Sequence, residues 1–334
     1  MNLDRRQMLK LMAILAAALA GNRGFTMDAA PRNEKDLARA ANGDFNVNAL
    51  AGSSNFKSIY GDPALKAAFL LFLTNVFHLF PEERLHRLIE DSANAGKTDR
   101  EIYAMVQARL PEIKPFLAEL RYALPALSKQ KDEMVAQTLE LLGPARAING
   151  YLELGTTGRY AGRLKSKLDV KGDLVLVHSA PPRYSPEDIV ERGGIGKLGR
   201  FVAMNDYAPV AASEVPDRTL DLVANYIGFH HSPLPKLDAF VASLHRTLRP
   251  GGRMIVRDHD VDSPAMNRMV ALAHDVFNMG LGTSWSVNQG ELRHFTSIPQ
   301  LVSYLEARGF KSDGRKLLQQ GDPTRNALMM FVRV

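Results

Sequence analysis

The chain has 334 residues, 46% of them hydrophobic, which is long enough for two globular domains with a substantial buried core. The chain has 42 lysines and arginines against 36 aspartates and glutamates, which gives a net charge of +6. No run of five or more basic residues occurs, and this argues against a nucleic-acid partner. The sequence has no cysteine, which excludes disulfides, thiolate metal ligands and a thiol nucleophile.

Residues 1–20 are predicted to be an export signal. Arg5, Arg6 and Lys10 precede an apolar stretch over residues 11–20, which ends in the small-residue pattern Ala18-Leu19-Ala20. This order of parts resembles a twin-arginine signal, and it implies a periplasmic protein that meets the twin-arginine translocation machinery. An ordinary amphipathic helix is the alternative, and it would leave the protein in the cytoplasm. The apolar stretch would span about 15 Å, roughly half of a bilayer core, so we expect no permanent membrane span.

A polar linker over residues 21–54 is expected to lead into a helical segment over residues 55–144. Helix starts are indicated at Asp62-Pro63 and at Pro81-Glu82, and Thr98 with Glu101 has the form of a capping box. Residues 64–80 are apolar on nearly every side, so this predicted helix should lie at the centre of the segment.

Residues 145–334 alternate between short β-rich runs and helices, which predicts a parallel sheet with right-handed crossovers. The first strands are expected at residues 151–154, 174–177, 201–204, 220–226 and 254–257. The last two, at residues 310–319 and 327–334, are joined by the turn Gly321-Asp322-Pro323-Thr324, which leaves no room for a helix. They must therefore pair antiparallel.

The block over residues 220–256 carries a family resemblance. The strand expected at residues 220–226 leads into Gly228-Phe229-His230-His231. A helix and then Leu248-Arg249-Pro250-Gly251-Gly252 follow, where proline is expected to stop the helix and the glycines to supply a positive-φ turn. This block resembles the fourth strand, helix and fifth strand of class I S-adenosylmethionine-dependent methyltransferases that act on small molecules.

The resemblance implies an α/β fold: a doubly wound seven-stranded methyltransferase sheet with a C-terminal antiparallel hairpin, preceded by the helical segment. It also implies S-adenosylmethionine as the cofactor and a small-molecule acceptor, and it leaves the oligomeric state open. The helical segment would either cover the substrate or dock a partner. The cofactor-binding residues implied by the resemblance are Glu153, Gly155, Thr157 and Gly158 after the first strand, His178 after the second, Asp206 and Tyr207 after the third, and Asn225 at the end of the fourth.

Two positions depart from the family pattern. The loop after the first strand is one residue short of the commonest form, and Thr157 stands near the place of a central glycine. The family usually has an acidic residue at the end of the second strand, which holds the ribose hydroxyls, whereas here His178 follows the strand and no carboxylate occurs before Glu187. His178 or Ser179 would then have to bind the ribose, and a neutral group is a weaker bidentate partner than a carboxylate.

The candidate catalytic residues follow the fourth and fifth strands. They are His230, His231, Asp258 and His259, and the ligand crevice of a parallel sheet lies at these carboxyl ends. Any of them could act as the base that removes a proton from the acceptor; as the alternative, paired histidines are structural loop residues. Together with Asp260 they have the chemistry of zinc or iron ligands, but a fifth strand that continues into an acidic loop is the simpler interpretation, and we predict no metal site.

The segment with Trp285, Asn288 and Arg293-His294-Phe295 stands where relatives hold substrate, and it would either stack on an aromatic acceptor or simply pack. Two functional hypotheses compete with methyl transfer. The first is an exported non-catalytic binding or assembly protein that retains a degenerate methyltransferase fold. The second is a nicotinamide-dependent oxidoreductase, which fits least because the spacing of Gly155, Gly158 and Gly162 does not match the dinucleotide fingerprint.

Overall fold

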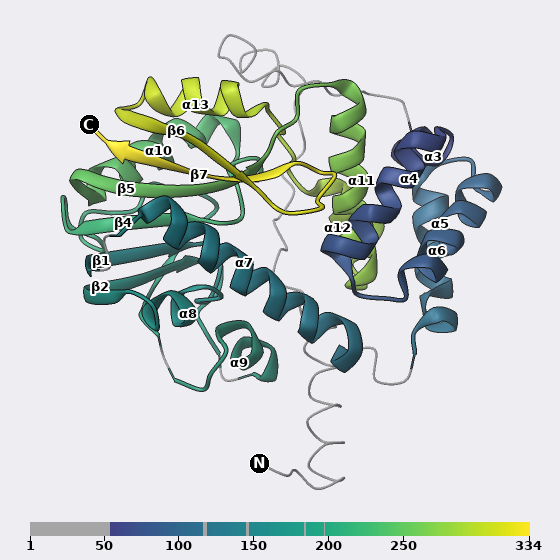
Figure 1. Ribbon diagram of the computed structural model, residues 1–334, viewed down its shortest axis with the longest axis horizontal. Coiled ribbons are helices and arrows are strands. Elements are labelled where there is room, and N and C mark those ends of the chain that lie inside the picture. The colour runs from purple at the N-terminus through teal and green to yellow at the C-terminus, as the bar shows by residue number, and fades with distance from the viewer. Residues whose placement is uncertain (1–53, 116–118, 145–146, 184, 197) are drawn as a thin grey trace, which may run out of the picture.

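The computed structural model describes residues 54–115, 119–144, 147–183, 185–196 and 198–334 (Figure 1). The predicted export signal and all but the last residue of the predicted linker lie outside the described residues. In the part of the chain that is described, no helix has both the length and the apolar character needed to cross a membrane.

The chain builds one seven-stranded sheet in the order β3-β2-β1-β4-β5-β7-β6. Its strands are β1 Ala147–Leu154, β2 Asp169–His178, β3 Arg200–Ala203, β4 Leu220–Asn225, β5 Leu248–His259, β6 Phe310–Leu318 and β7 Asn326–Arg333. The first five pair parallel to one another, and β7 runs antiparallel to both β5 and β6. This order confirms the predicted α/β fold, with a doubly wound methyltransferase sheet and a C-terminal antiparallel hairpin.

Both faces of the sheet are buried under helices, which explains why its central strands are apolar at successive positions. In β1, Leu152 and Leu154 belong to one core and Tyr151 to the core on the opposite face. The first face is covered by α10 (Leu234–Thr247) and α13 (Ile298–Glu306), and the second by α7 (Leu124–Leu142) and α8 (Ala161–Lys165), as Figure 1 shows. The short helix α9 (Pro186–Arg192) lies beside α8.

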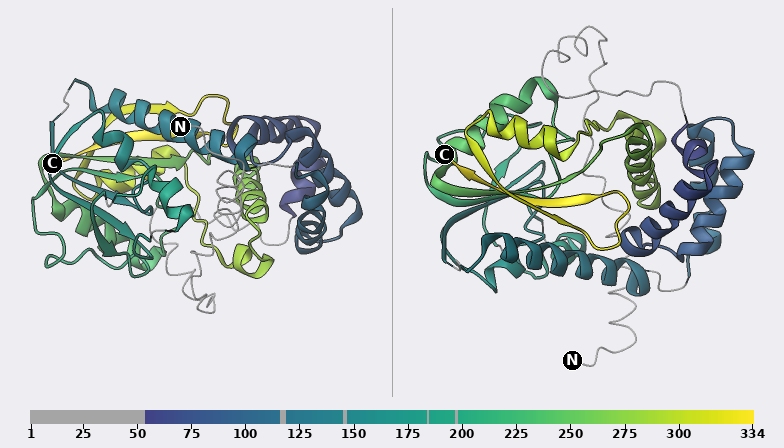
Figure 2. Two further views of the ribbon diagram at one scale, coloured as in Figure 1. Left: turned by 90° about the horizontal axis from the view of Figure 1, so that it is seen from below. Right: turned by 45° about the horizontal axis from the view of Figure 1, so that its top comes forward.

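A second group of helices lies beside the sheet (Figure 2). It contains α3 (Asn55–Tyr60), α4 (Pro63–Phe72), the π-helix η1 (Leu73–Phe77), α5 (Glu82–Ala95) and α6 (Asp99–Ile113). A further π-helical turn, η2 (Glu119–Ala123), leads into α7. The predicted helix starts are present: Asp62 caps α4, α5 begins after Pro81, and Thr98 and Glu101 form the capping box of α6.

The core of this helical group is completed from the other half of the chain. Helix α11 (Pro264–Gly280) contributes Met269, Leu272 and Val276 to the same apolar cluster as Phe56, Phe69 and other residues of the early helices. The short helix α12 (Trp285–Gly290) follows α11, and its Trp285 packs edge-on against Tyr103 at a ring-centroid distance of 5.2 Å. Conversely, α7 comes from the predicted helical segment but packs on the sheet.

Two local expectations differ from the structure. The helix expected over residues 64–80 ends at Phe72, and the chain continues through η1 to His78, which adopts the left-handed conformation with φ 39°. Helix α10 ends at Thr247, before Pro250, and β5 already begins at Leu248. Of the two glycines, Gly251 alone has positive φ, 75°. Leu248 already pairs with Leu220 of β4, so the sheet begins directly where the helix ends.

Candidate functional site

The four candidate catalytic residues lie together at the carboxyl ends of two adjacent parallel strands. His230 and His231 follow β4, and Asp258 and His259 are the last two residues of β5. His230, Asp258 and His259 are each less than 10% exposed. The sheet thus brings together side chains that are almost thirty positions apart in the sequence.

Asp258 holds the loop after β4 in place. Its Oδ1 lies 2.6 Å from His230 Nδ1, and its Oδ2 accepts a hydrogen bond from the backbone N–H of Phe229 at 2.9 Å. An ionised carboxylate can only accept, so His230 Nδ1 carries the hydrogen of this bond. Gly228 permits the tight turn: its φ is 80°, and a Cβ there would lie 2.5 Å from His230 Nδ1. The arrangement therefore directs Nε2 of His230 away from Asp258.

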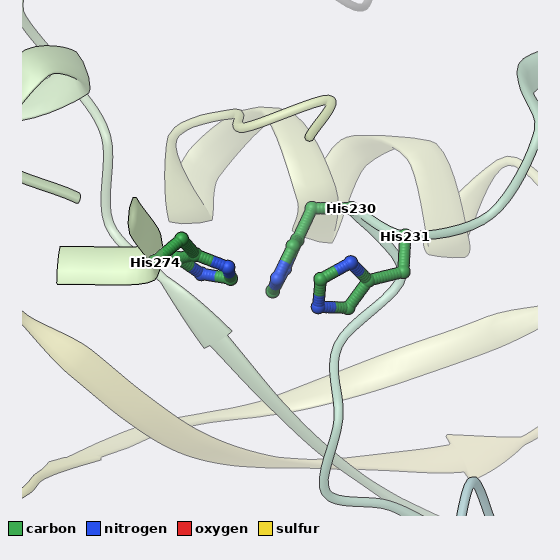
Figure 3. A group of neighbouring side chains, drawn as sticks. All are labelled: His230, His231 and His274. Atoms are coloured by element: carbon green, nitrogen blue, oxygen red, sulfur yellow. The ribbon is translucent and has the colours of Figure 1, made fainter. Parts of the chain in front are cut away.

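A third histidine, which sequence analysis did not select, joins this pair from α11. The ring of His274 lies 5.3 Å from that of His230 and 5.4 Å from that of His231, and the two latter rings are 4.2 Å apart. Figure 3 shows the rings of His230 and His231, from one loop, lying beside the ring of His274. Phe295 packs against His230 and His274, at 5.2 Å from each ring. The available signal was the polar pair His274-Asp275 between the apolar runs at residues 269–273 and 276–277 of this helix.

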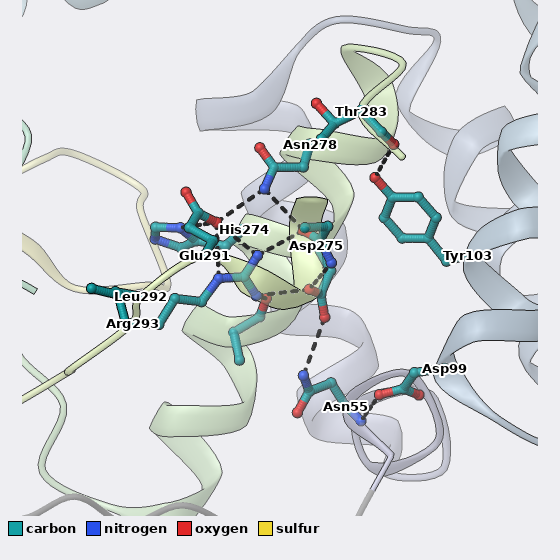
Figure 4. A network of polar contacts seen from close by, with 12 residues as sticks. Asn55, Asp99, Tyr103, His274, Asp275, Asn278, Thr283, Glu291, Leu292 and Arg293 are labelled. Carbon is teal, nitrogen blue, oxygen red and sulfur yellow. Dashed lines mark hydrogen bonds and ion pairs between the residues drawn. The ribbon is translucent and has the colours of Figure 1, made fainter. Parts of the chain in front are cut away.

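A buried network of ion pairs and hydrogen bonds contacts His274 (Figure 4). Arg293 donates to Glu291 Oε2 at 2.9 Å and to Asp275 Oδ1 at 2.7 Å. Asp275 also accepts from Asn55 Nδ2 at 3.1 Å, and Glu291 Oε2 lies 3.8 Å from His274 Nδ1. The network thus joins the first helix of the helical group to the histidine cluster.

Burial and partners shift the pKa values of this cluster in opposite directions. Burial lowers the pKa values of His231, His259 and His274, so their imidazoles are neutral at pH 7. Burial raises the pKa of Asp258, but the charge and hydrogen bond of His230 outweigh burial and bring this pKa to about 2. For Glu291 too, contacts with His274 and Arg293 outweigh burial and hold the pKa well below its usual range. Both carboxyl groups are therefore ionised.

Both ring nitrogens of His259 have partners. Nδ1 donates to the carbonyl oxygen of Thr324 at 3.0 Å, and Nε2 lies 3.3 Å from Asn326 Nδ2 on the paired strand β7. These contacts give His259 a role in joining β5 to the C-terminal hairpin.

The predicted cofactor residues Gly155, Thr157 and Gly158 lie in the loop after β1, and Glu153 lies near the end of β1 itself. Gly155 and Gly158 have φ values of 76° and 103°, which glycine adopts without strain. Ile227, which follows β4, lies directly against Gly155: a Cβ on that glycine would be 2.1 Å from Ile227 Cδ1. The packing of Ile227 is thus sufficient to require glycine at position 155.

Glu153 is fully buried, and its carboxylate is held by groups of its own loop and strand. It accepts hydrogen bonds from Tyr151 Oη at 2.8 Å, from Thr156 Oγ1 and from the backbone N–H of Tyr160 at 3.2 Å. Burial raises its pKa, and these hydrogen bonds offset only part of that effect. Glu153 therefore organises the turn that follows β1.

The other predicted cofactor residues lie at the carboxyl ends of their strands, in different environments. The ring of His178 turns onto its own loop, where Nδ1 contacts the backbone of Ala180. Asp206 is exposed and pairs with Lys236. Asn225 is buried at the end of β4, and its Oδ1 accepts from the backbone N–H of Ile227 at 3.3 Å.

Among the described residues, three buried hydroxyl groups have no hydrogen-bond partner. They belong to Thr157, Tyr207 and Ser232, and each follows the carboxyl end of a strand: β1, β3 and β4. A buried hydroxyl without a partner is costly, so in native proteins such a group usually meets a ligand, an ion or a bound water. His230 Nε2 is a fourth unpartnered polar atom at this edge of the sheet.

No protein-family model matches the chain, and no curated protein matches it. Among solved structures, it is similar to 1,6-didemethyltoxoflavin-N1-methyltransferase of Burkholderia thailandensis, with 17% identity, 63% of this chain and 79% of that chain covered, and a TM-score of 0.40. Magnesium protoporphyrin IX methyltransferase of Synechocystis PCC 6803 is 13% identical over 62% of this chain and 83% of its own, with a TM-score of 0.39.

A methyltransferase described as putative, from Bacillus halodurans C-125, is 14% identical over 60% of this chain and 98% of its own, with a TM-score of 0.42. These scores are too low to assign an activity. The strand order of the chain defines a doubly wound α/β protein with the methyltransferase sheet. The candidate site residues lie at the carboxyl edge of that sheet.

Proposed function

We propose that this protein transfers a methyl group from S-adenosylmethionine to a small-molecule acceptor. The observation that carries the proposal is the set of buried, unpartnered polar atoms at one edge of the sheet, on Thr157, Tyr207, His230 and Ser232. In an open α/β sheet, ligands bind at the carboxyl ends of the strands, where the order of the strands reverses. Here the reversal falls between β1 and β4, which precede Thr157 and the histidines.

The residues present fit a polar ligand of this kind. The hydroxyls of Thr157 and Tyr207 would each give it a hydrogen bond. When bound, S-adenosylmethionine supplies an electrophilic methyl group whose sulfur keeps the bonding electron pair as the acceptor atom takes the methyl carbon. We propose that the acceptor binds beside His230 and His231, beyond the carboxyl ends of β4 and β5.

The orientation of His230 suits the acceptor side of this reaction. Asp258 accepts the Nδ1 hydrogen of His230, so the neutral form of this imidazole would present its lone pair on Nε2. Such a lone pair has two chemical uses, which are to take a proton from an acceptor and to bind a metal ion. Removal of a proton from the acceptor needs only His230 and Asp258, and Asp258 is the residue that orients the imidazole.

Titration calorimetry of the full chain with S-adenosylmethionine and S-adenosylhomocysteine tests the proposal. We expect both to bind, and Tyr207→Phe or Thr157→Val to weaken each by about 2- to 10-fold, the equivalent of one hydrogen bond. Neither substitution should lower the free energy of unfolding of the unliganded protein, because each removes a hydroxyl that has no partner. The matched control is Tyr103→Phe, which loses the 2.7 Å bond to Thr283 O and should reduce stability while leaving binding unchanged.

The main alternative is an exported non-catalytic binding or assembly protein with a degenerate methyltransferase fold. It is favoured by the carboxylate of Glu153, which its own loop already satisfies, and by His178, which stands in place of an acid and turns onto Ala180. A wild-type chain that binds neither adenosyl compound would refute methyl transfer and favour this alternative. If the chain instead gives a heat of binding when it is titrated with NADH, this would indicate an oxidoreductase.

We also propose that the chain is exported to the periplasm through a twin-arginine-like signal, and the support for this is the order of residues 1–20 alone. Cell fractionation followed by mass spectrometry of the amino terminus tests it. A mature chain that begins near Gly21 in the periplasm is the expected result. An intact Met1 found only in the cytosol would contradict it.

A further inference from the structure

We propose that His230, His231 and His274 form a binding site for one divalent transition-metal ion of the zinc class, at the carboxyl end of β4. Each side chain offers one ligand nitrogen, and these three nitrogens all lie within 4.8 Å of one another (Figure 3). Imidazole nitrogen is a preferred ligand of zinc, copper, iron and nickel. The third ligand comes from α11, so the site exists only in the folded chain.

The spacing is close to that of a loaded site. Three nitrogens at 2.0–2.1 Å from a tetrahedral zinc ion are about 3.4 Å apart. Because the three nitrogens lie within 4.8 Å of one another, bringing them to 3.4 Å requires each pair to close by at most about 1.4 Å.

The second nitrogen of each ring is held as it usually is in metal sites. A histidine ligand generally donates its other N–H to a carboxylate or a backbone carbonyl, which fixes the ring and its tautomer. His230 Nδ1 is bound to Asp258 at 2.6 Å, and His231 Nδ1 to the carbonyl oxygen of Leu292 at 3.1 Å. His274 Nδ1 faces Glu291 Oε2 at 3.8 Å. All three rings thus have a partner on the Nδ1 side.

An independent observation points to a ligand in the same place. Nε2 of His230 is buried and has no hydrogen-bond partner among the described residues. Leaving such an atom unpaired costs free energy, and a bound ion would remove that cost. The unpartnered atom belongs to the histidine whose Nδ1 is bound to Asp258 at 2.6 Å.

The surrounding charges favour a cation. Asp258 and Glu291 contact the rings directly, while Arg293 is shared between Glu291 and Asp275. Three carboxylates therefore face one guanidinium. Phe295 covers His230 and His274 on a further side, which lowers the local dielectric and strengthens this attraction.

Three protein ligands leave one position of a four-coordinate ion open to water. An oxygen or nitrogen atom of the methyl acceptor could occupy that position. Only this role of the acceptor rests on the proposed function. The metal site itself does not depend on it.

The test uses the full chain without a histidine tag, treated with chelator, dialysed and titrated with Zn²⁺ by calorimetry and with Co²⁺ by visible absorption. We expect one ion per chain and the absorption bands of four-coordinate cobalt with nitrogen ligands. His274→Gln should weaken binding by more than about 100-fold, and Asp258→Asn, which keeps the ligands but frees one ring, by about 10- to 100-fold. His86→Gln on α5 is the matched control and should bind like the wild type.

Circular dichroism and a thermal melt in the absence of metal show whether each variant folds, and His231→Gln replaces His274→Gln if the latter does not. The proposal is overturned if the wild type shows no saturable binding, or if a folded His274→Gln or His231→Gln variant binds as well as the wild type. If the chain binds zinc but not S-adenosylmethionine, the proposed function is refuted and the metal site is supported. If it binds S-adenosylmethionine but not zinc, the metal site is refuted and the proposed function is supported.

Discussion

Replacing Gly155 by alanine tests the packing of the loop after β1. Gly155 has φ 76°, and an added Cβ would lie 2.1 Å from Ile227 Cδ1 and 2.7 Å from Cγ1. Ordinary van der Waals contacts begin near 3.4 Å, so the overlap is 3.4 − 2.1 = 1.3 Å. The isoleucine must therefore move, or the turn must open.

Two separate costs add in this variant. The left-handed backbone costs a residue with a Cβ about 1–2 kcal/mol, and the overpacking costs about 1–3 kcal/mol. We therefore expect Gly155→Ala to lower the free energy of unfolding by about 2–5 kcal/mol. Urea denaturation followed by circular dichroism measures this change.

A double-mutant cycle separates the two costs. In an Ile227→Ala background the overlap is absent, so Gly155→Ala should cost only the backbone part, about 1–2 kcal/mol. The coupling energy between the two sites should be about 1–3 kcal/mol. An equal cost of Gly155→Ala in both backgrounds would refute the account, because it would show that Ile227 does not determine the need for glycine.

Three further outcomes are expected. Arg293→Met should lower the free energy of unfolding by about 3–5 kcal/mol, because it leaves the buried carboxylates of Asp275 and Glu291 without their cation; a cost under about 1 kcal/mol in urea denaturation would contradict the network. Burial lowers the pKa of Lys131 from 10.5 to about 8, so between these values the unfolded chain binds more protons and stability rises with pH. Unfolding free energies at several pH values in this window should therefore increase more steeply for the wild type than for Lys131→Met, and parallel curves would contradict this. Thr98→Ala should cost about 1 kcal/mol by removing the capping box of α6, and an unchanged urea midpoint would count against that bond.

The sheet was predictable from the sequence because its signals are local. Each predicted strand overlaps an observed one, and the turn over residues 321–324 indicated the antiparallel hairpin that β6 and β7 form. Strand ends were less accurate: β5 begins at Leu248, which pairs with Leu220 of β4, and the register then shifts before the ladder resumes at Arg253.

The histidine cluster was only partly predictable. His230, His231, Asp258 and His259 follow strands that the pattern identified, so their place at one edge of the sheet could be expected. His274 lies on α11, and nothing in the local sequence indicates how a helix between two strands will be placed beside them. The partners of His259, Thr324 and Asn326, likewise come from the hairpin far along the chain.

The packing of α11 among the early helices has a consequence for synthesis. The last early helix ends at Ile113 and α11 begins at Pro264, a separation of 264 − 113 = 151 residues. At ribosomal rates of about 5–20 residues per second, roughly 8–30 s pass before the nascent helices can meet their missing partner. During that time the apolar side chains that α11 will cover are exposed, so chains that terminate before Pro264 should be the forms of this protein that aggregate most readily.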